Sequence, residues 1–215
     1  MTRIIFIRHG QSEANFVRIG GGQRNYPLTE LGRAQARLAA KYLLKNEKID
    51  AVYSSDLCRA VDTALPVADA LGLTVMTDKR LREVDTGAFA GMHLDDRELN
   101  YPKEFKLLQT DFSHMRYPNG EYVPDVYDRV SECVCEIARA NVGKTVLIAA
   151  HGGTIHIFDA FARGYSREET GKAKGVGNTA INIYECDGTS ASVIRTNITD
   201  HLSEDPDDVP DTDKQ

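Results

Sequence analysis

Short apolar runs alternate along the chain with longer segments of helical period. Residues 4–7 are four consecutive apolar positions, and residues 145–150 form a second, mostly apolar run. Runs of this length that are rich in β-branched residues are typical of strands buried on both faces of a parallel sheet. Further strands are predicted at residues 49–53, 73–76, 178–184 and 191–196, and an Asp-Gly turn joins the last two as a hairpin.

The segments between these runs predict helices. Thr29 is the expected N-cap of a helix that ends near Asn46, and a second helix stops before Gly72. A third helix carries an apolar stripe from Val126, and a fourth follows Gly153. The N-cap of the second helix is expected at one of three consecutive polar residues, namely Ser54, Ser55 or Asp56.

Strands that alternate with helices predict an α/β fold of three layers, in which helices cover both faces of a mainly parallel central sheet. Residues 1–199 are expected to form a single domain. Glycines and prolines interrupt the pattern in residues 84–124, which predicts a helical insertion with loops, a candidate lid. Residues 11–28 are predicted to be a loop for the same reason.

Charge divides the chain into a neutral body and an acidic end. The net charge is −6, yet residues 200–215 hold seven acids and one base, which leaves 25 of each in residues 1–199. We expect this end to be a solvated, disordered tail, with an interaction segment as the alternative. A neutral body argues against nucleic-acid binding.

Composition also limits location and cofactors. No stretch approaches the roughly 18 apolar residues of a membrane span, and the apolar run after Arg3 is too short for a signal peptide, so we expect a cytoplasmic protein without a membrane partner. The four cysteines form no C-x-x-C pair and are expected to be free, mostly buried thiols. No spacing resembles a zinc site, so we expect no metal and no cofactor. No feature of the sequence predicts the oligomeric state.

The apolar runs at residues 4–7 and 145–150 both lead to a histidine followed by glycine. Arg8, His9 and Gly10 close the first run, and His151 and Gly152 follow the second. Ligands of open α/β sheets bind at the carboxyl ends of the strands, and glycine lets a backbone N–H approach a ligand closely. Either histidine alone is more often a polar residue satisfied locally, but the pair indicates an anion site.

Five blocks of sequence resemble the histidine phosphatase superfamily, which has the phosphoglycerate-mutase-like fold. They occur in the family's order and span about residues 3–185. The blocks are residues 8–10 with 12–15, 27–32, 54–64, 81–83 with the glycines at 87 and 91, and 151–153. The resemblance implies a metal-independent phosphomonoesterase of the histidine acid phosphatase type, a phosphoric monoester hydrolase acting on small phosphorylated metabolites.

The resemblance also implies roles for individual residues. His9 is the nucleophile that becomes phosphorylated, Arg8, Arg59 and His151 hold the phosphoryl oxygens, and Glu83 is the proton donor. These residue types suit the chemistry. A neutral imidazole is a usable nucleophile, guanidinium groups present planar forks of donors that keep their charge, and a positioned acid helps a poor leaving group to depart.

Other assignments stay open at this stage. Asn15, Gln23 and Gly152 are expected to contact the phosphate or the loop beside it. Asp85 is a rival to Glu83 as the acid. An ion pair between Glu83 and one of its neighbours, Arg80 or Arg82, is the structural alternative. Three histidines are predicted to be ordinary polar residues: His93, His114 and His156.

Two other functions compete with hydrolysis. One is phosphoglycerate-mutase-type transfer, and the other is a phosphate-ligand-binding protein that has lost turnover. The chain has no tryptophan, and its loop at 20–26 lacks the Gly-Trp-x-Asp of the family's mutases, which favours hydrolysis. The substrate cannot be named from the sequence. Five basic residues are weighed equally as contacts for further anionic groups or as solvated charges: Arg18, Arg24, Lys103, Lys106 and Arg116.

Overall fold

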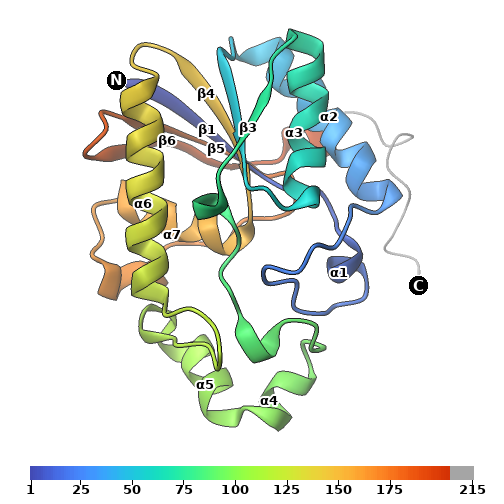
Figure 1. Cartoon of the computed structure of the whole chain (residues 1–215), viewed down its shortest axis with the longest axis vertical. Coiled ribbons are helices and arrows are strands. Elements are labelled where there is room, and N and C mark those ends of the chain that lie inside the picture. The colour runs from blue at the N-terminus through green and yellow to red at the C-terminus, as the bar shows by residue number, and fades with distance from the viewer. Residues whose placement is uncertain (204–215) are drawn as a thin grey trace.

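A computed structural model describes residues 1–203, in which a six-stranded sheet lies between two layers of helices (Figure 1). The strand order is β3-β2-β4-β1-β5-β6. The first four of these are parallel, whereas β5 is antiparallel to β1 and β6 is antiparallel to β5. The predicted α/β fold with a mainly parallel sheet is therefore confirmed. The strands are β1 (Thr2–Arg8), β2 (Ala51–Ser54), β3 (Val75–Thr77), β4 (Thr145–Ala150), β5 (Ile181–Cys186) and β6 (Ala191–Ile198).

The helices occupy the segments between the strands. The α-helices are α1 (Glu13–Phe16), α2 (Glu30–Asn46), α3 (Cys58–Leu71), α4 (Asp96–Asn100), α5 (Pro102–Thr110), α6 (Val123–Ala140) and α7 (Gly152–Ala162). The 3₁₀ turns are η1 (Lys79–Leu81), η2 (Gly87–Phe89), η3 (Phe112–His114), η4 (Arg167–Lys172) and η5 (Asp200–Leu202). As predicted, the Thr29 hydroxyl caps α2, and Gly72 ends α3 in the left-handed conformation.

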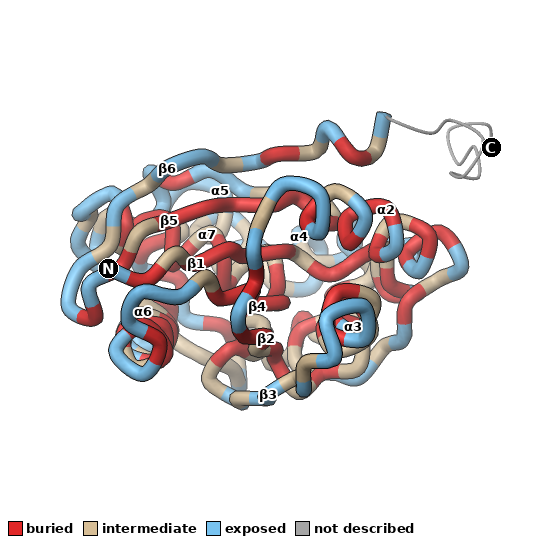
Figure 2. The backbone as a smooth tube through the Cα atoms, turned by 90° about the horizontal axis from the view of Figure 1, so that it is seen from above, coloured by how far each residue is buried: buried red, intermediate tan, exposed pale blue. Residues whose placement is uncertain are grey.

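Alternate residues of the central strands face opposite layers. Ile4 and Phe6 of β1 pack in a cluster with α6 and α7, whereas Ile5 and Ile7 pack in a cluster with α2 and α3. Figure 1 shows these helix pairs on opposite sides of the sheet, and Figure 2 shows that buried residues concentrate on the central strands. This double burial explains why the strand has no polar alternation.

The register of β1 on β4 places the two histidines at one edge of the sheet. Arg8 pairs with Ala150, and the His9 N–H donates to the Ala150 carbonyl at 3.0 Å. His9 and His151 therefore leave neighbouring parallel strands at the same point. Gly10 packs so closely against the backbone of Gly32 in α2 that a Cβ would overlap it, which is why the residue after His9 has no side chain.

Several boundaries differ from the predictions. The predicted loop at 11–28 contains α1, which Ser12 and Asn15 stabilise as a reciprocal capping box. The N-cap of α3 is Leu57, without a side-chain cap, rather than one of the three preceding polar residues. The first residues of the predicted acidic tail form η5, in which His201 is buried. The remaining tail, 204–215, lies outside the described residues.

The region 84–124 is a helical insertion with loops, as predicted. It contains η2, α4, α5 and η3, and Figure 1 shows α4 and α5 at the end of the molecule away from the sheet. None of the helices described in residues 1–203 is long and apolar enough to cross a membrane.

Candidate active site

The two predicted histidines meet in the interior. His151 is fully buried, His9 is 4% exposed, and their ring centroids lie 5.2 Å apart. Each ring is carried by the residue that follows a central strand, so both are fixed by the parallel pairing of β1 and β4. The sequence prediction that these imidazoles converge agrees with this geometry.

The hydrogen bonds of His9 assign its tautomer. Nδ1 lies 2.7 Å from the Gly10 carbonyl oxygen, which only accepts, so Nδ1 carries the proton. Nε2 then carries no proton, and its lone pair accepts a hydrogen bond from the Arg59 Nε–H at 3.3 Å. Burial lowers the pKa of His9 well below its ordinary value, and the charges of Arg59 and Arg8 lower it further. His9 is therefore a neutral imidazole with Nε2 as its nucleophilic atom.

His151 has two polar atoms without a protein partner. Both ring nitrogens are buried, and neither forms a hydrogen bond with any residue that the structure describes. Burial lowers the pKa of His151 well below its ordinary value, with the Arg59 charge as the next cause. Unpaired buried polar groups are rare and costly, so this imidazole is suited to a ligand that supplies the missing bonds.

Two guanidinium groups accompany the histidines. Arg59 is 2% exposed and donates to the carbonyls of Gly22 and Arg24 at 2.8 Å each. Arg8 donates from Nη1 to the Val176 carbonyl at 2.6 Å, while its buried Nε has no partner. Burial lowers the pKa of both side chains, and within residues 1–203 neither forms an ion pair with a carboxylate. Arg59 is buried and Arg8 is half-buried, and cations removed from water without an ion-pair partner favour an anionic ligand.

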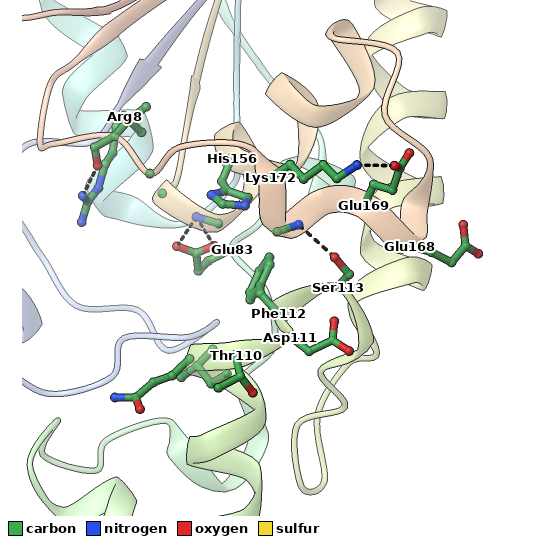
Figure 3. Close-up of a pocket in the computed structure, with 17 residues that line it drawn as sticks. Arg8, Glu83, Thr110, Asp111, Phe112, Ser113, His156, Glu168, Glu169 and Lys172 are labelled. Carbon is green, nitrogen blue, oxygen red and sulfur yellow. Dashed lines mark hydrogen bonds and ion pairs between the residues drawn. The ribbon is translucent and has the colours of Figure 1, made fainter.

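Glu83 points toward the start of α7. Its carboxylate accepts hydrogen bonds from the Gly153 N–H at 3.0 and 3.2 Å (Figure 3). It also accepts one from the Val84 N–H at 2.9 Å. Its carbonyl accepts from Gln23 Nε2 at 3.1 Å and from Arg129 Nη2 at 3.2 Å. These bonds fix both the side chain and the backbone of Glu83.

The alternatives for Glu83 do not match the geometry. Arg82 pairs with Asp56 at 2.6 Å, and Arg80 pairs with acids other than Glu83. The Asp85 carboxylate accepts from the Gly87 N–H at 3.0 Å and so closes a local turn. Glu83 lines the cavities described below, whereas Asp85 is absent from their linings among the described residues.

The other predicted contacts lie at the edge of this cluster. Asn178 Nδ2 donates to the His9 carbonyl at 2.9 Å and to Asn15 Oδ1 at 3.3 Å, so Asn15 supports the loop after His9. Gln23 contacts the backbone carbonyl of Glu83 and does not bond to the Glu83 carboxylate. Gly152 lies beside the Arg8 guanidinium at the first position of α7.

A cavity of about 820 Å³ opens beside the cluster (Figure 3). Arg8, Glu83 and Gly152 line it, together with residues 108–113 of the insertion and residues of η4, whereas the two histidines are too buried to line it. A second cavity of about 290 Å³ shares three lining residues with the first: Glu83, Phe112 and Gly153. Glu83 therefore stands where two lobes of one cleft meet.

His156 was predicted to be an ordinary polar residue, but it lines the larger cavity. Its Nε2 lies 2.9 Å from the Thr170 carbonyl, and its ring packs edge-on against Phe112 with centroids 5.0 Å apart. A signal was present in the sequence, because His156 follows Gly152 by four residues and so shares its helix face.

The four cysteines are free thiols, as predicted. Cys58 is half-buried, and the other three are buried.

Among residues 1–203, no group of three or more His, Cys, Asp or Glu side chains is arranged to hold a metal ion. That the reaction needs no metal stays a prediction.

The chain is similar to known proteins over most of its length. The family model described as "Histidine phosphatase superfamily (branch 1)" matches residues 4–199. Phosphoglycerate mutase-like protein 4 of Arabidopsis thaliana is 31% identical over 94% of this chain and 88% of its own, and phosphoserine phosphatase 1 of Hydrogenobacter thermophilus is 29% identical over 95% and 96%. The structure of a mycobacterial glucosyl-3-phosphoglycerate phosphatase in complex with VO3 has a TM-score of 0.85 at 29% identity, covering 92% of this chain and 99% of that one.

Proposed function

Because the chain belongs to the histidine phosphatase superfamily, we propose that it is a metal-independent phosphomonoesterase acting on small phosphorylated metabolites through a phosphohistidine at His9. One observation carries the proposal. The unprotonated Nε2 of a neutral His9 lies among Arg59, Arg8 and the unpartnered His151, so a nucleophile and the groups that would hold an anion are within one cluster. Relatives named as phosphatases support it.

In the first step, His9 Nε2 attacks the phosphorus atom and the bond between phosphorus and the ester oxygen breaks. Arg8, Arg59 and His151 bind the equatorial oxygens, where negative charge is concentrated, and phosphoryl transfer depends chiefly on such positioning and charge stabilisation. Glu83 gives its proton to the departing oxygen, so that the product leaves as an alcohol.

In the second step, water attacks the phosphohistidine. Glu83, now a carboxylate, accepts a proton from this water, the P–N bond breaks, and inorganic phosphate and neutral His9 are released. The Gly153 N–H stabilises the carboxylate between the two steps, because it donates to both carboxylate oxygens at the first turn of α7.

The test is an assay of phosphate release from a panel of phosphomonoesters with a chelator present. We expect the wild-type protein to release phosphate, and His9→Ala to lose activity by at least about 10³-fold because the nucleophile is gone. Arg33→Lys, on the exposed face of α2, is the matched control and should behave as wild type. Equal turnover by His9→Ala, or loss of wild-type activity with chelator, would overturn the proposal.

A mutase is the second candidate, since relatives of this chain carry that name. The same panel separates the two functions. Migration of phosphate between hydroxyl groups without release would favour the mutase, and binding of phosphomonoesters without either reaction would favour a binding protein.

A further inference from the structure

The two lobes of the cleft differ in charge. The larger cavity is lined by four acids, Glu83, Asp111, Glu168 and Glu169, and by two bases, of which Arg8 is assigned to the phosphoryl group and Lys172 is paired with Glu169. The smaller cavity of about 290 Å³ is lined by two arginines, and Glu83 is the one acid in its lining among the described residues. An anionic group of a substrate is therefore repelled by the larger lobe and attracted by the smaller one.

The smaller lobe also contains two hydrogen-bonding atoms that lack partners. Arg97 Nε and Thr86 Oγ1 are buried, and neither bonds to another of the residues 1–203. The guanidinium of Arg97 packs over the Phe89 ring at 5.3 Å from its centroid but forms no ion pair with an acid in the part of the chain that the structure describes. The other arginine of this lobe, Arg18, is paired with Asp95 at 3.2 Å. Unsatisfied buried donors are costly unless a ligand completes them.

The loop beside His9 connects this lobe to the phosphate site. A Cβ on Gly20 would overlap the Arg97 guanidinium, and Gly22 accepts a hydrogen bond from Arg59 at 2.8 Å. A Cβ on Gly22 would in turn crowd Thr86 Oγ1. The short glycine loop therefore has the phosphate-binding Arg59 on one side and the unpartnered pair on the other.

We propose that Arg97 and Thr86 form a carboxylate subsite, so that the preferred substrates are small phosphomonoesters whose alcohol part carries a carboxylate. This inference rests on the proposed function for the position of the phosphoryl group. The phosphoryl group lies at His9, the ester oxygen faces Glu83, and the carboxylate enters the smaller lobe, where the Arg97 fork and the Thr86 hydroxyl donate to it. One carboxylate can accept a hydrogen bond from each of these two unsatisfied groups.

Two matched pairs of ligands test the subsite. 3-Phosphoglycerate differs from glycerol 3-phosphate, and O-phosphoserine from O-phosphoethanolamine, by the carboxylate. Dissociation constants are measured by calorimetry in the His9→Ala background, where no turnover occurs, and kcat/KM is measured with His9 intact. In both assays we expect the carboxylated member of each pair to be preferred, and Arg97→Gln to reduce that preference by about 10- to 100-fold, the value of a charge-assisted hydrogen bond.

Two further variants complete the design. Thr86→Val removes the hydroxyl and keeps the shape, and it should reduce the preference by a smaller factor, about fivefold. Arg116→Gln is the control. Arg116 is exposed, lies with its guanidinium 4.4 Å from the centroid of the Tyr122 ring, and lines neither lobe. This variant should prefer the carboxylated ligand of each pair as strongly as the wild-type protein does.

The binding and turnover assays test the carboxylate subsite and the phosphatase activity separately. A carboxylate preference in binding that depends on Arg97, without phosphate release by the wild-type protein, would keep the subsite and refute the phosphatase. Phosphate release with equal kcat/KM and equal affinity within each pair would keep the phosphatase and refute the subsite, as would an equal loss for both members in Arg97→Gln.

Discussion

Burial keeps His9 neutral by lowering its pKa, and the charges of Arg59 and Arg8 favour the same state. In the proposed function, the same two charges also attract the phosphoryl oxygens. At 4 Å and an effective dielectric constant of about 20, each opposite-charge pair contributes about 4 kcal/mol before desolvation is subtracted. Two cations without an ion-pair partner are thus proposed both to keep Nε2 of His9 unprotonated and to hold the substrate.

The buried histidines predict how stability depends on pH. The pKa values of His9 and His151 lie well below their ordinary value in the folded protein, because burial disfavours the charged imidazole. As pH falls below about 6.5, the unfolded chain binds protons that the folded protein does not, so stability is lost by about 1.4 kcal/mol per pH unit for each such group. Urea unfolding between pH 7.5 and 5.0, without phosphate, measures this slope.

We expect His151→Asn to make the slope shallower by about one proton, or up to about 1.4 kcal/mol per pH unit. Arg33→Lys is the control, because it exchanges two side chains that both stay charged between pH 5.0 and 7.5, and it should leave the slope unchanged. Parallel curves for wild type and His151→Asn would contradict the assignment of a neutral, buried His151.

Some residues of the site could be predicted from the sequence and others could not. His9 and His151 were found because each directly follows an apolar strand, where position along the chain determines position in space. Arg97 was not singled out, because it stands among Asp95, Asp96 and Glu98 and resembles a solvated charge cluster. Its missing partner is visible only when side chains from distant segments are placed together.

At the scale of elements, α6 supports the segment that carries Glu83. Arg129 of α6 donates to the carbonyls of Arg80 and Arg82 at 2.7 and 3.1 Å, in addition to that of Glu83, and it forms a fork with Glu121 at 2.7 and 2.8 Å. Burial alone would raise the pKa of Glu121, but the bonds from Arg129 hold it below the ordinary value. The segment has no strand or long helix of its own, so this guanidinium fixes it.

We therefore propose that Arg129 is a positioning residue for Glu83, the proposed acid. Glu83→Gln should slow alkyl phosphates by roughly 10² or more and aryl phosphates much less, since a good leaving group needs no proton. We expect Arg129→Lys to share this selectivity at a smaller scale, about tenfold in kcat for alkyl phosphates, because lysine lacks the fork that holds several carbonyls. Arg33→Lys serves again as the surface control. An equal loss on both ester types would show that Arg129 acts on the fold alone.

Elements with a strong apolar period were predictable, and short capped elements were not. The strands β1 and β4 and the helices α2 and α3 follow from burial patterns and from the caps Thr29 and Gly72. In contrast, α1 has only four residues. It is stabilised by the hydrogen bonds of the capping box between Ser12 and Asn15, although glycines and a proline elsewhere in residues 11–28 disfavour a helix. Local hydrogen bonds of this kind leave little trace in a hydrophobic pattern.

At the scale of the whole molecule, the cleft is built from segments far apart in the sequence. The insertion and η4 meet where the Gly171 N–H donates to Ser113 Oγ at 2.9 Å, and Figure 3 shows this bond on the wall of the larger cavity. The sequence predicted a helical insertion in this region. The charge of each lobe depends on which of its side chains pair with one another, and a pattern along the chain does not give that pairing.

The acidic end of the chain gives the last prediction. Residues 204–215 carry six acids and one base, whereas the groups proposed to act on the phosphate all lie within residues 1–199. At about 0.15 M salt, screening over about 8 Å weakens the repulsion of anionic substrates by charges that do not contact them, and truncation after Ser203 removes none of the proposed groups, so it should leave kcat/KM within about twofold of the full chain. A full-length variant with these acids changed to Asn or Gln distinguishes charge from length. A loss of tenfold or more on truncation that the neutralised chain does not share would show that this segment contributes contacts to the enzyme.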